Sequence, residues 1–145
     1  MYIKFKVVVR STVKPFMIPL PALKNAFTVG DDVIDLFGFG SMVIGGHRYT
    51  SDLIIYPDGR VREGWRRSRG HVLTKVDLQT VLATGSEVII VGTGIYGRMQ
   101  PEPGLEKALG KMGIHFMAGP NDQAVTWYND RSATRKVGAC FHLSC

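Results

Sequence analysis

Hydrophobic positions in the first part of the chain follow the two-residue period of β-strands. Residues 2–9 alternate between apolar side chains and lysines, which predicts a half-buried strand. Residues 11–30 contain three prolines and a glycine, a composition that predicts an irregular linker or arm. Between residues 33 and 65, β-branched and aromatic residues are separated by glycines, and the Pro-Asp-Gly sequence at 57–59 marks a hairpin turn. We therefore expect an antiparallel meander in this part of the chain.

Further along the chain, apolar positions recur every three or four residues, the period of helices that pack on a core. The first predicted helix runs from the N-cap Thr74 to Gly85, and the second covers residues 103–112. A third begins at Asn121 or Asp122. The side chains expected to face the core from these helices are Leu78, Val81, Leu82, Leu105, Ala108, Leu109, Met112, Ala124, Val125 and Tyr128.

Short apolar runs at 87–91, 114–117 and 137–143 predict strands between and after the later helices. The resulting β-α-β-α-β order favours parallel strands with helices packed on the sheet. We therefore predict a three-layer α/β fold around a mixed sheet, with an N-terminal β-meander and a C-terminal β-α-β-α-β unit. The predicted domain covers residues 32–145, and residues 1–31 form an N-terminal extension or arm.

The overall composition is that of one ordinary globular domain. The chain has 145 residues, of which 45% are hydrophobic, so it is long enough to bury a core and is not expected to be disordered. No run approaches the roughly 20 apolar residues that a membrane-spanning helix needs. The first residues lack the small-residue cleavage site of a signal peptide, so we expect a cytoplasmic location and no membrane partner.

The net charge of +6 is concentrated in one stretch. Residues 60–75 hold six basic residues against one acidic residue, whereas the rest of the chain holds twelve against eleven. A tryptophan among arginines is also found where proteins stack on nucleic-acid bases. The other interpretation is a solvated hairpin end whose tryptophan covers the core, and nucleic acid is not the expected partner. The interaction patch predicted from this stretch consists of Arg60, Arg62, Trp65, Arg66, Arg67 and Arg69.

The sequence VIIVGTGIYG at 88–97 has the glycine spacing of a dinucleotide-binding loop. In such a loop the third glycine lies in the first turn of a helix, but Pro101 and Pro103 delay the helix here. No acidic residue that could hold a ribose follows the strand at 114–117. We therefore predict a strand-end turn and no nucleotide cofactor. A pocket for a small anion or other small molecule is the alternative, formed by Gly92, Thr93, Gly94, Tyr96, Gly97, Arg98 and Asn129.

The two cysteines, Cys140 and Cys145, lie too close along one strand to pair easily, so both are expected as free thiols. Cys140 and His142 would share a strand face, but no nearby acid orients the histidine, so no catalytic residue is assigned. The C-x-H-x-x-C spacing is not an established zinc motif, and no metal is expected. The remaining histidines are scattered without metal-ligand spacing: His47, His71 and His115.

Several segments occur in an order typical of one family: FGFGSMVIGGHRYTSDLIIYPDGRV, VIIVGTGIYGRMQPEPGLEKALGKMGI and AVTWYNDRSATRKVGACFHLSC. The chain resembles, over about residues 32–145, the Mth-type domain of unknown function. This family includes an adipogenesis-associated Mth-domain protein and mitochondrial NADH dehydrogenase (complex I) assembly factor three. The family's recurring positions correspond to Gly38, Tyr49, Asp52, Trp65, Gly92, Gly94, Gly97, Pro101, Ala124, Tyr128, Asn129, Arg135 and Cys145.

The resemblance implies a three-layer α/β fold, and it brings no established catalytic residue or cofactor. Its assembly-factor members imply binding to another protein. From the sequence we therefore expect a non-catalytic protein-binding or assembly module. The alternative is a small-molecule or anion-binding protein, or an enzyme, that uses a pocket at the glycine loop. A cleft with converging polar groups would favour the alternative, whereas an exposed patch without a deep cleft would favour the binding module.

Overall fold

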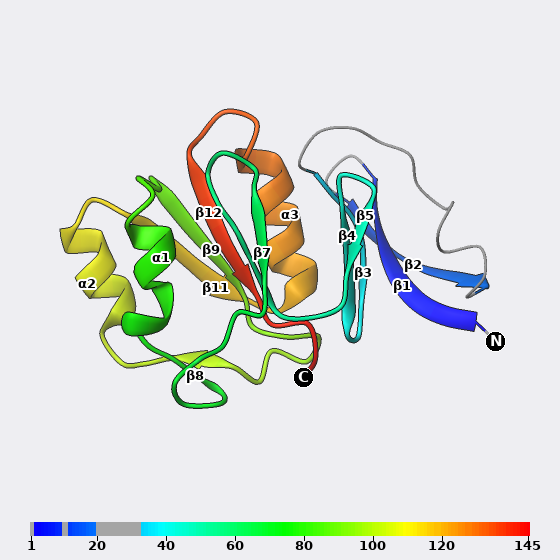
Figure 1. The fold of residues 1–145 in the computed structure, drawn as a ribbon, viewed down its shortest axis with the longest axis horizontal. Helices are drawn as coiled ribbons and strands as arrows, with labels where there is room; N and C mark the ends of the chain where they lie inside the picture. The colour runs from blue at the N-terminus through cyan, green and yellow to red at the C-terminus, as the bar shows by residue number, and fades with distance from the viewer. Residues whose placement is uncertain (1, 10–11, 20–32) are drawn as a thin grey trace.

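The computed structural model describes residues 2–9, 12–19 and 33–145 (Figure 1). Its central element is a five-stranded mixed sheet in the order β11-β9-β12-β6-β7. The strands, in that order, are His115–Gly119, Val88–Gly92, Val137–Phe141, Leu53–Ile55 and Val61–Glu63. β11, β9 and β12 are parallel, whereas β6 and β7 form the predicted antiparallel hairpin. The predicted α/β fold class and mixed sheet are confirmed.

Helices cover both faces of this sheet, which explains why β9 and β12 are apolar throughout and fully buried. The 3₁₀-helix η2 (Val76–Leu78), α1 (Gln79–Leu82) and α2 (Leu105–Lys111) lie on one face, and α3 (Asn121–Arg131) lies on the other (Figure 1). No helix in the described part of the chain is long and apolar enough to span a bilayer.

The helix predicted at 74–84 is shorter than expected. The Asp77 carboxylate accepts hydrogen bonds from the N–H and hydroxyl of Thr74, which is the predicted contact at a helix start. The 3₁₀ turn and one α-helical turn that follow end at Leu82, before the predicted stop at Gly85. The prediction that Met112 faces the core is wrong, because α2 ends at Lys111 and the Met112 side chain is 51% exposed. The sheet contacts of α2 come from its first two turns, through Leu105 and Leu109.

A second, antiparallel sheet has the strand order β2-β1-β3-β4-β5. The strands β1 to β5 are Tyr2–Val9, Thr12–Pro19, Ile34–Gly38, Ser41–Ile44 and His47–Tyr49. The irregular arm predicted for residues 11–30 is therefore wrong over 12–19, which pair with β1 along their whole length. Pro15 and Pro19 are compatible with a strand because β2 lies at the edge of this sheet. Residues 20–32 lie outside the described residues.

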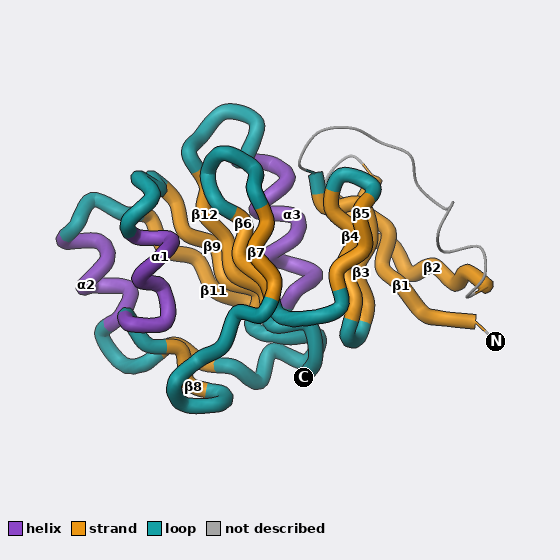
Figure 2. The backbone as a smooth tube through the Cα atoms, viewed as in Figure 1, coloured by secondary structure: helices purple, strands orange, loops and turns teal. Residues whose placement is uncertain are grey.

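The second sheet packs against α3 on the side away from the main sheet (Figure 2). Ile34 and Phe37 of β3 belong to the same core cluster as Val88 and Ile90 of β9. A small parallel pair, β8 (Val72–Leu73) with β10 (Gln100–Pro101), lies below the main sheet in Figure 1. This pair joins the last part of the basic stretch to the segment after the glycine loop.

Candidate functional site

The glycine loop lies at the carboxyl ends of the three parallel strands, as its position after β9 predicts. The N–H of Thr93 donates to the Gly119 carbonyl at the end of β11, at 2.9 Å. The N–H of His142, just beyond β12, donates to the Gly92 carbonyl, also at 2.9 Å. The loop is therefore fixed between the ends of both neighbouring strands.

The space that the sequence suggested for a ligand is filled by the chain itself. The N–H of Ile95 donates to the Ser144 carbonyl at 2.7 Å, and the N–H of Arg98 donates to the Cys145 carbonyl at 3.1 Å. Gly94 has a φ of 110°, and a Cβ at this position would overlap the main chain of Cys145. Main-chain donors of the loop thus bind carbonyls of residues 144–145.

Asn121 is the side chain that holds the loop from below, and sequence reasoning missed this role. Its Oδ1 accepts the N–H of Gly94 at 3.1 Å, and its Nδ2 donates to the His142 carbonyl at 2.8 Å. Gly92 must lack a side chain because a Cβ would overlap the Asn121 amide and the Phe141 ring. The sequence suggested Asn121 as a helix cap, whereas Pro120 is the N-cap and Asn121 is buried beneath the loop.

The other predicted ligand residues do not converge on the loop. Tyr96 is 70% exposed and Arg98 is exposed. Asn129 lies eight residues after Asn121 in α3, about 12 Å further along the helix axis. There its amide binds the main chain of Ile34, accepting from the N–H and donating to the carbonyl at 3.0 Å each. Asn129 therefore holds β3 against α3 at the opposite end of the helix.

A buried ion-pair cluster lies beside the loop. Asp52 precedes β6, Arg67 follows β7 and His142 follows β12. The Asp52 carboxylate lies 3.0 Å from Arg67 Nη1 and 2.7 Å from His142 Nδ1, and it accepts the N–H of Leu143 at 2.8 Å. Burial opposes the ionisation of Asp52, but the hydrogen bonds from Leu143, His142 and Arg67 together hold its pKa below the usual value.

The predicted basic patch divides into a buried and an exposed part. Trp65 is 6% exposed, and its indole N–H donates to the Asp77 carbonyl at 3.0 Å. The Arg67 guanidinium lies 5.1 Å from the centre of the Trp65 ring and is committed to Asp52. Trp65 and Arg67 are therefore internal, which corrects their place in the predicted surface patch. The remaining arginines of the patch are less buried: Arg60, Arg62, Arg66 and Arg69.

A thiol and two imidazoles meet at the edge of the same cluster. Cys145 Sγ lies 3.3 Å from His71 Nε2 and 4.0 Å from His142 Nε2. The Ser144 hydroxyl lies 3.3 Å from the same His142 nitrogen. Cys140, by contrast, is fully buried in the apolar cluster under α1 and α2, and burial raises the pKa of its thiol. Both thiols are free, and the histidine that contacts Cys145 from outside the final segment is His71.

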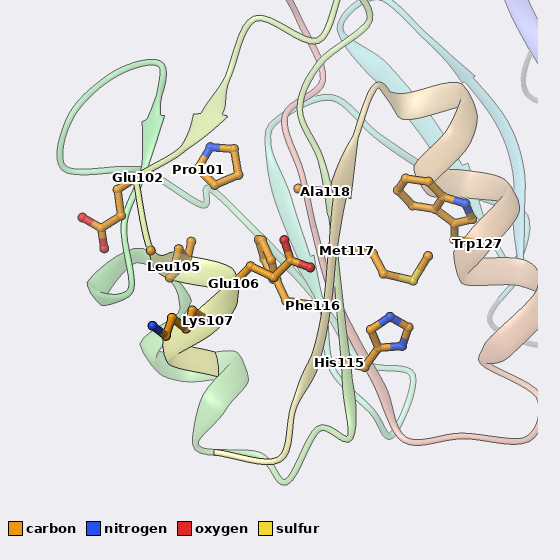
Figure 3. A pocket seen from close by; sticks show the side chains of 11 residues that line it. Pro101, Glu102, Leu105, Glu106, Lys107, His115, Phe116, Met117, Ala118 and Trp127 are labelled. Carbon is orange, nitrogen blue, oxygen red and sulfur yellow. The ribbon is translucent and has the colours of Figure 1, made fainter. Parts of the chain in front are cut away.

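A groove follows the outer edge of β11 between α2 and α3 (Figure 3). Its volume is about 890 Å³, and it is wide open to solvent. Phe116 and Ala118 face the α2 side, whereas Met117 and Trp127 lie on the α3 side. Its rim carries charged or polar side chains: Glu102, Glu106, Lys107 and His115.

The main chain of β11 leaves hydrogen-bonding groups on this open side. The N–H of His115 and the carbonyl of Gly119 bind the β9 side of the sheet. Because main-chain groups alternate in direction along a strand, Met117 also pairs with β9, and Phe116 and Ala118 present their N–H and C=O groups outward. Within the described residues, β11 has no strand partner on that side.

The comparisons with known proteins agree with this fold. Conserved hypothetical protein PH1505 from Pyrococcus horikoshii OT3 is 26% identical, with a TM-score of 0.67 over 77% of this chain and 98% of that chain. A structure named MT938 is 27% identical, with a TM-score of 0.64 over 78% and 98% of the two chains. A Bordetella pertussis protein described as a Mth938-like domain shares the fold at 20% identity, with a TM-score of 0.61 over 90% and 92%.

The sequence comparison covers the residues that build both the loop and the groove. The model of the family described as "Protein of unknown function (DUF498/DUF598)" matches residues 34–142, which is most of the chain. Together with the Mth938-like neighbours, this match confirms the resemblance to an Mth-type domain. The chain therefore belongs to the DUF498/DUF598 family of proteins of unknown function.

Proposed function

We propose that this domain is a non-catalytic, cytoplasmic protein-binding module that accepts an extended segment of a partner protein along the open edge of β11. The observation that carries this proposal is the unpaired outer side of β11 within the described sheet, framed by α2 and α3. An added strand would take hydrogen bonds from Phe116 and Ala118, which supply affinity without regard to the partner's sequence.

Side chains around the edge would supply selectivity. A strand added beside β11 places alternate residues on its two faces. One set would contact Met117 and Trp127, and the other would lie towards the first turn of α2. Aromatic residues and methionine are enriched at the centres of protein interfaces, and charged residues are typical of the rim. The groove has this arrangement, with Glu106 and Lys107 at its border.

The shape of the groove favours a single extended segment over a second copy of this domain. A second copy paired through its own β11 would bring another α2 and α3 to the same gap, whereas an extended peptide brings no flanking layers. The alternative of a ligand pocket at the glycine loop has less support, because the Ile95 and Arg98 amides bind residues 144–145 and Gly94 binds Asn121.

The test is a peptide-display selection with the full chain as bait, followed by NMR mapping of a selected peptide. We expect shifts of the Phe116 and Ala118 amides and of the Trp127 indole, and slower hydrogen exchange at both amides. Ala118→Pro removes one outward N–H while leaving the β9 pairing of Met117 and Gly119, and should abolish binding. Tyr96→Ala removes an exposed aromatic residue outside the groove and should leave binding unchanged.

Four results would contradict the proposal. The first is a selection that yields no binding peptide. The second is a set of shifts that map away from β11, and the third is equal binding by a folded Ala118→Pro variant. The fourth is a dimer in sedimentation experiments that Ala118→Pro dissociates, because this would make a second copy the occupant of the edge.

A further inference from the structure

We infer that His71, His142 and Cys145 bind a single Zn²⁺ ion. One ligand atom from each residue lies within 4.8 Å of the other two. The Cys145 Sγ lies 3.3 Å from His71 Nε2 and 4.0 Å from His142 Nε2. In a tetrahedral zinc site, the bond lengths of nitrogen and sulfur ligands place neighbouring ligand atoms about 3.3–3.6 Å apart. A movement of less than about 1.5 Å by the side chains would therefore complete the three-ligand geometry.

The Asp52 contact of His142 leaves the lone pair on Nε2, where a metal ion would take the place of the Ser144 hydroxyl contact at 3.3 Å. Its Nδ1 lies 2.7 Å from the Asp52 carboxylate and 3.2 Å from Arg67 Nη2. A carboxylate oxygen at 2.7 Å requires a proton between it and the ring, so we assign the Nδ1 proton as the donor to Asp52. With this tautomer, Arg67 Nη2 is a close neighbour of Nδ1 and not a hydrogen-bond donor to it. The lone pair of neutral His142 is then on Nε2, the atom that faces Cys145. A carboxylate behind a ligating histidine is a common arrangement in zinc sites, where it fixes the tautomer and orients the ring.

The main chain holds the other two ligands in place and leaves them accessible. The carbonyl of His71 accepts the N–H of Gln100 at the start of the β8–β10 pair, at 2.8 Å. The carbonyl of Cys145 accepts the N–H of Arg98. The His71 side chain is exposed and Cys145 is half-buried, so an ion can reach the cluster from solvent.

The chemistry of the ligands selects the class of metal. Two imidazoles and a thiolate suit Zn²⁺, whereas Ca²⁺ and Mg²⁺ require oxygen ligands. Arg67 does not leave an uncompensated positive charge beside the site, because it is paired with Asp52. Three protein ligands would leave a fourth position for water. The bound ion would join the segment before β8 to the segment after β12.

The test uses the full chain, reduced and stripped of metal by a chelator, and then titrated with Zn²⁺ in competition with a chromophoric chelator. We expect one ion per chain and a higher thermal unfolding temperature with Zn²⁺ than without it. Co²⁺ in place of Zn²⁺ should give a thiolate-to-cobalt charge-transfer band in the near ultraviolet and the strong visible bands of tetrahedral cobalt.

Ligand variants decide which residues are responsible. His71→Gln and Cys145→Ser change exposed or half-buried side chains and should each abolish the cobalt charge-transfer band while leaving the circular dichroism spectrum unchanged. The matched controls are His47→Gln, an exposed histidine of β5, and Cys140→Ala, the buried thiol. Both should retain stoichiometric binding. Failure of the unmodified chain to bind equimolar Zn²⁺, or undiminished binding by His71→Gln and Cys145→Ser, would overturn the inference. Either result would leave the β11 proposal unaffected.

Discussion

Asp52 Oδ2 and His142 Nδ1 lie 2.7 Å apart, although 90 residues separate them in the chain. The same carboxylate holds Arg67 and the N–H of Leu143. This one side chain therefore joins the start of β6, the segment after β7 and the end of β12 next to the glycine loop.

Replacing Asp52 with alanine should destabilise the fold strongly. The Arg67 side chain is 9% exposed, so loss of its partner leaves a buried charge without compensation. We expect the free energy of unfolding, measured by urea denaturation, to fall by about 3–5 kcal/mol. The control is Glu87→Gln, which breaks the exposed pair with Arg135 and should change stability little. Equal effects of the two variants would contradict the assigned role of Asp52.

Asn121→Ala should loosen the glycine loop. The variant leaves the N–H of Gly94 and the carbonyl of His142 buried without partners, at a cost of about 2 kcal/mol. Hydrogen exchange should show faster exchange of the Gly94 amide. Asn121→Asp keeps the acceptor for Gly94 but places an oxygen against the His142 carbonyl, so it should protect the amide and still destabilise the protein. An unchanged Gly94 exchange rate in Asn121→Ala would refute the contact.

Alanine at Gly94 and at Gly110 should have opposite effects. At Gly94 the new Cβ meets the main chain of Cys145 at a φ of 110°, so stability should fall by about 2 kcal/mol or more. At Gly110 in α2 a Cβ meets nothing within 4 Å, and alanine should stabilise the helix by up to ~1 kcal/mol. Thermal unfolding of the two variants provides the comparison, and a tolerated Gly94→Ala would show that residues 144–145 do not fill the loop.

Acidification should remove the contribution of the Asp77 carboxylate to the stability of the folded protein. Burial raises its pKa, but hydrogen bonds from Thr74 and Ser68 outweigh this effect and hold the pKa below its usual value. A carboxyl with a lower pKa in the folded state stabilises fully above its unfolded pKa of about 4, and this contribution disappears as the pH falls through the folded pKa. Asp77→Asn should therefore be less stable than the unmodified protein at neutral pH, and the difference should shrink below about pH 4.

The measurement for Asp77 is the urea midpoint as a function of pH. Glu63→Gln, a change at an exposed carboxyl of β7, serves as the control and should leave the urea midpoint at neutral pH close to that of the unmodified protein. A difference between Asp77→Asn and the unmodified protein that stays constant from neutral to acidic pH would argue against an ionised Asp77 as the acceptor.

Much of the main sheet could be predicted from the sequence, because its apolar runs correspond to strands that are buried in the fold. The run at 88–92 is apolar at nearly every position, and a strand buried on both faces has this composition. The 57–59 turn was also predictable, because Gly59 adopts a φ of 88° that glycine tolerates without strain. The error at residues 12–19 has a physical cause. Proline opposes central strands but not edge strands, and the sequence does not say which strand lies at an edge.

The candidate sites were less predictable because their members come from distant parts of the chain. Cys145 and His142 are close in sequence, and their spacing alone argued against a metal site. The third member, His71, reaches them through the β8–β10 pair, at a separation of 74 residues from Cys145. The open side of β11 depends in the same way on strand order, since β12 rather than β11 occupies the position between β9 and β6.

The difference between what the sequence determines and what the tertiary structure decides has a simple physical basis. Periodicity, turn residues and composition act over a few neighbouring positions, so the chain itself specified the helices, the parallel strands and the strand-end position of the glycine loop. Other features depend on contacts between segments far apart in the chain. These features are the carbonyl partners of the glycine-loop amides, the burial of Trp65 and the identity of the histidine that contacts Cys145. Those contacts are fixed by packing of the whole fold, which buries Asn121 beneath the loop and brings Asp52 to His142.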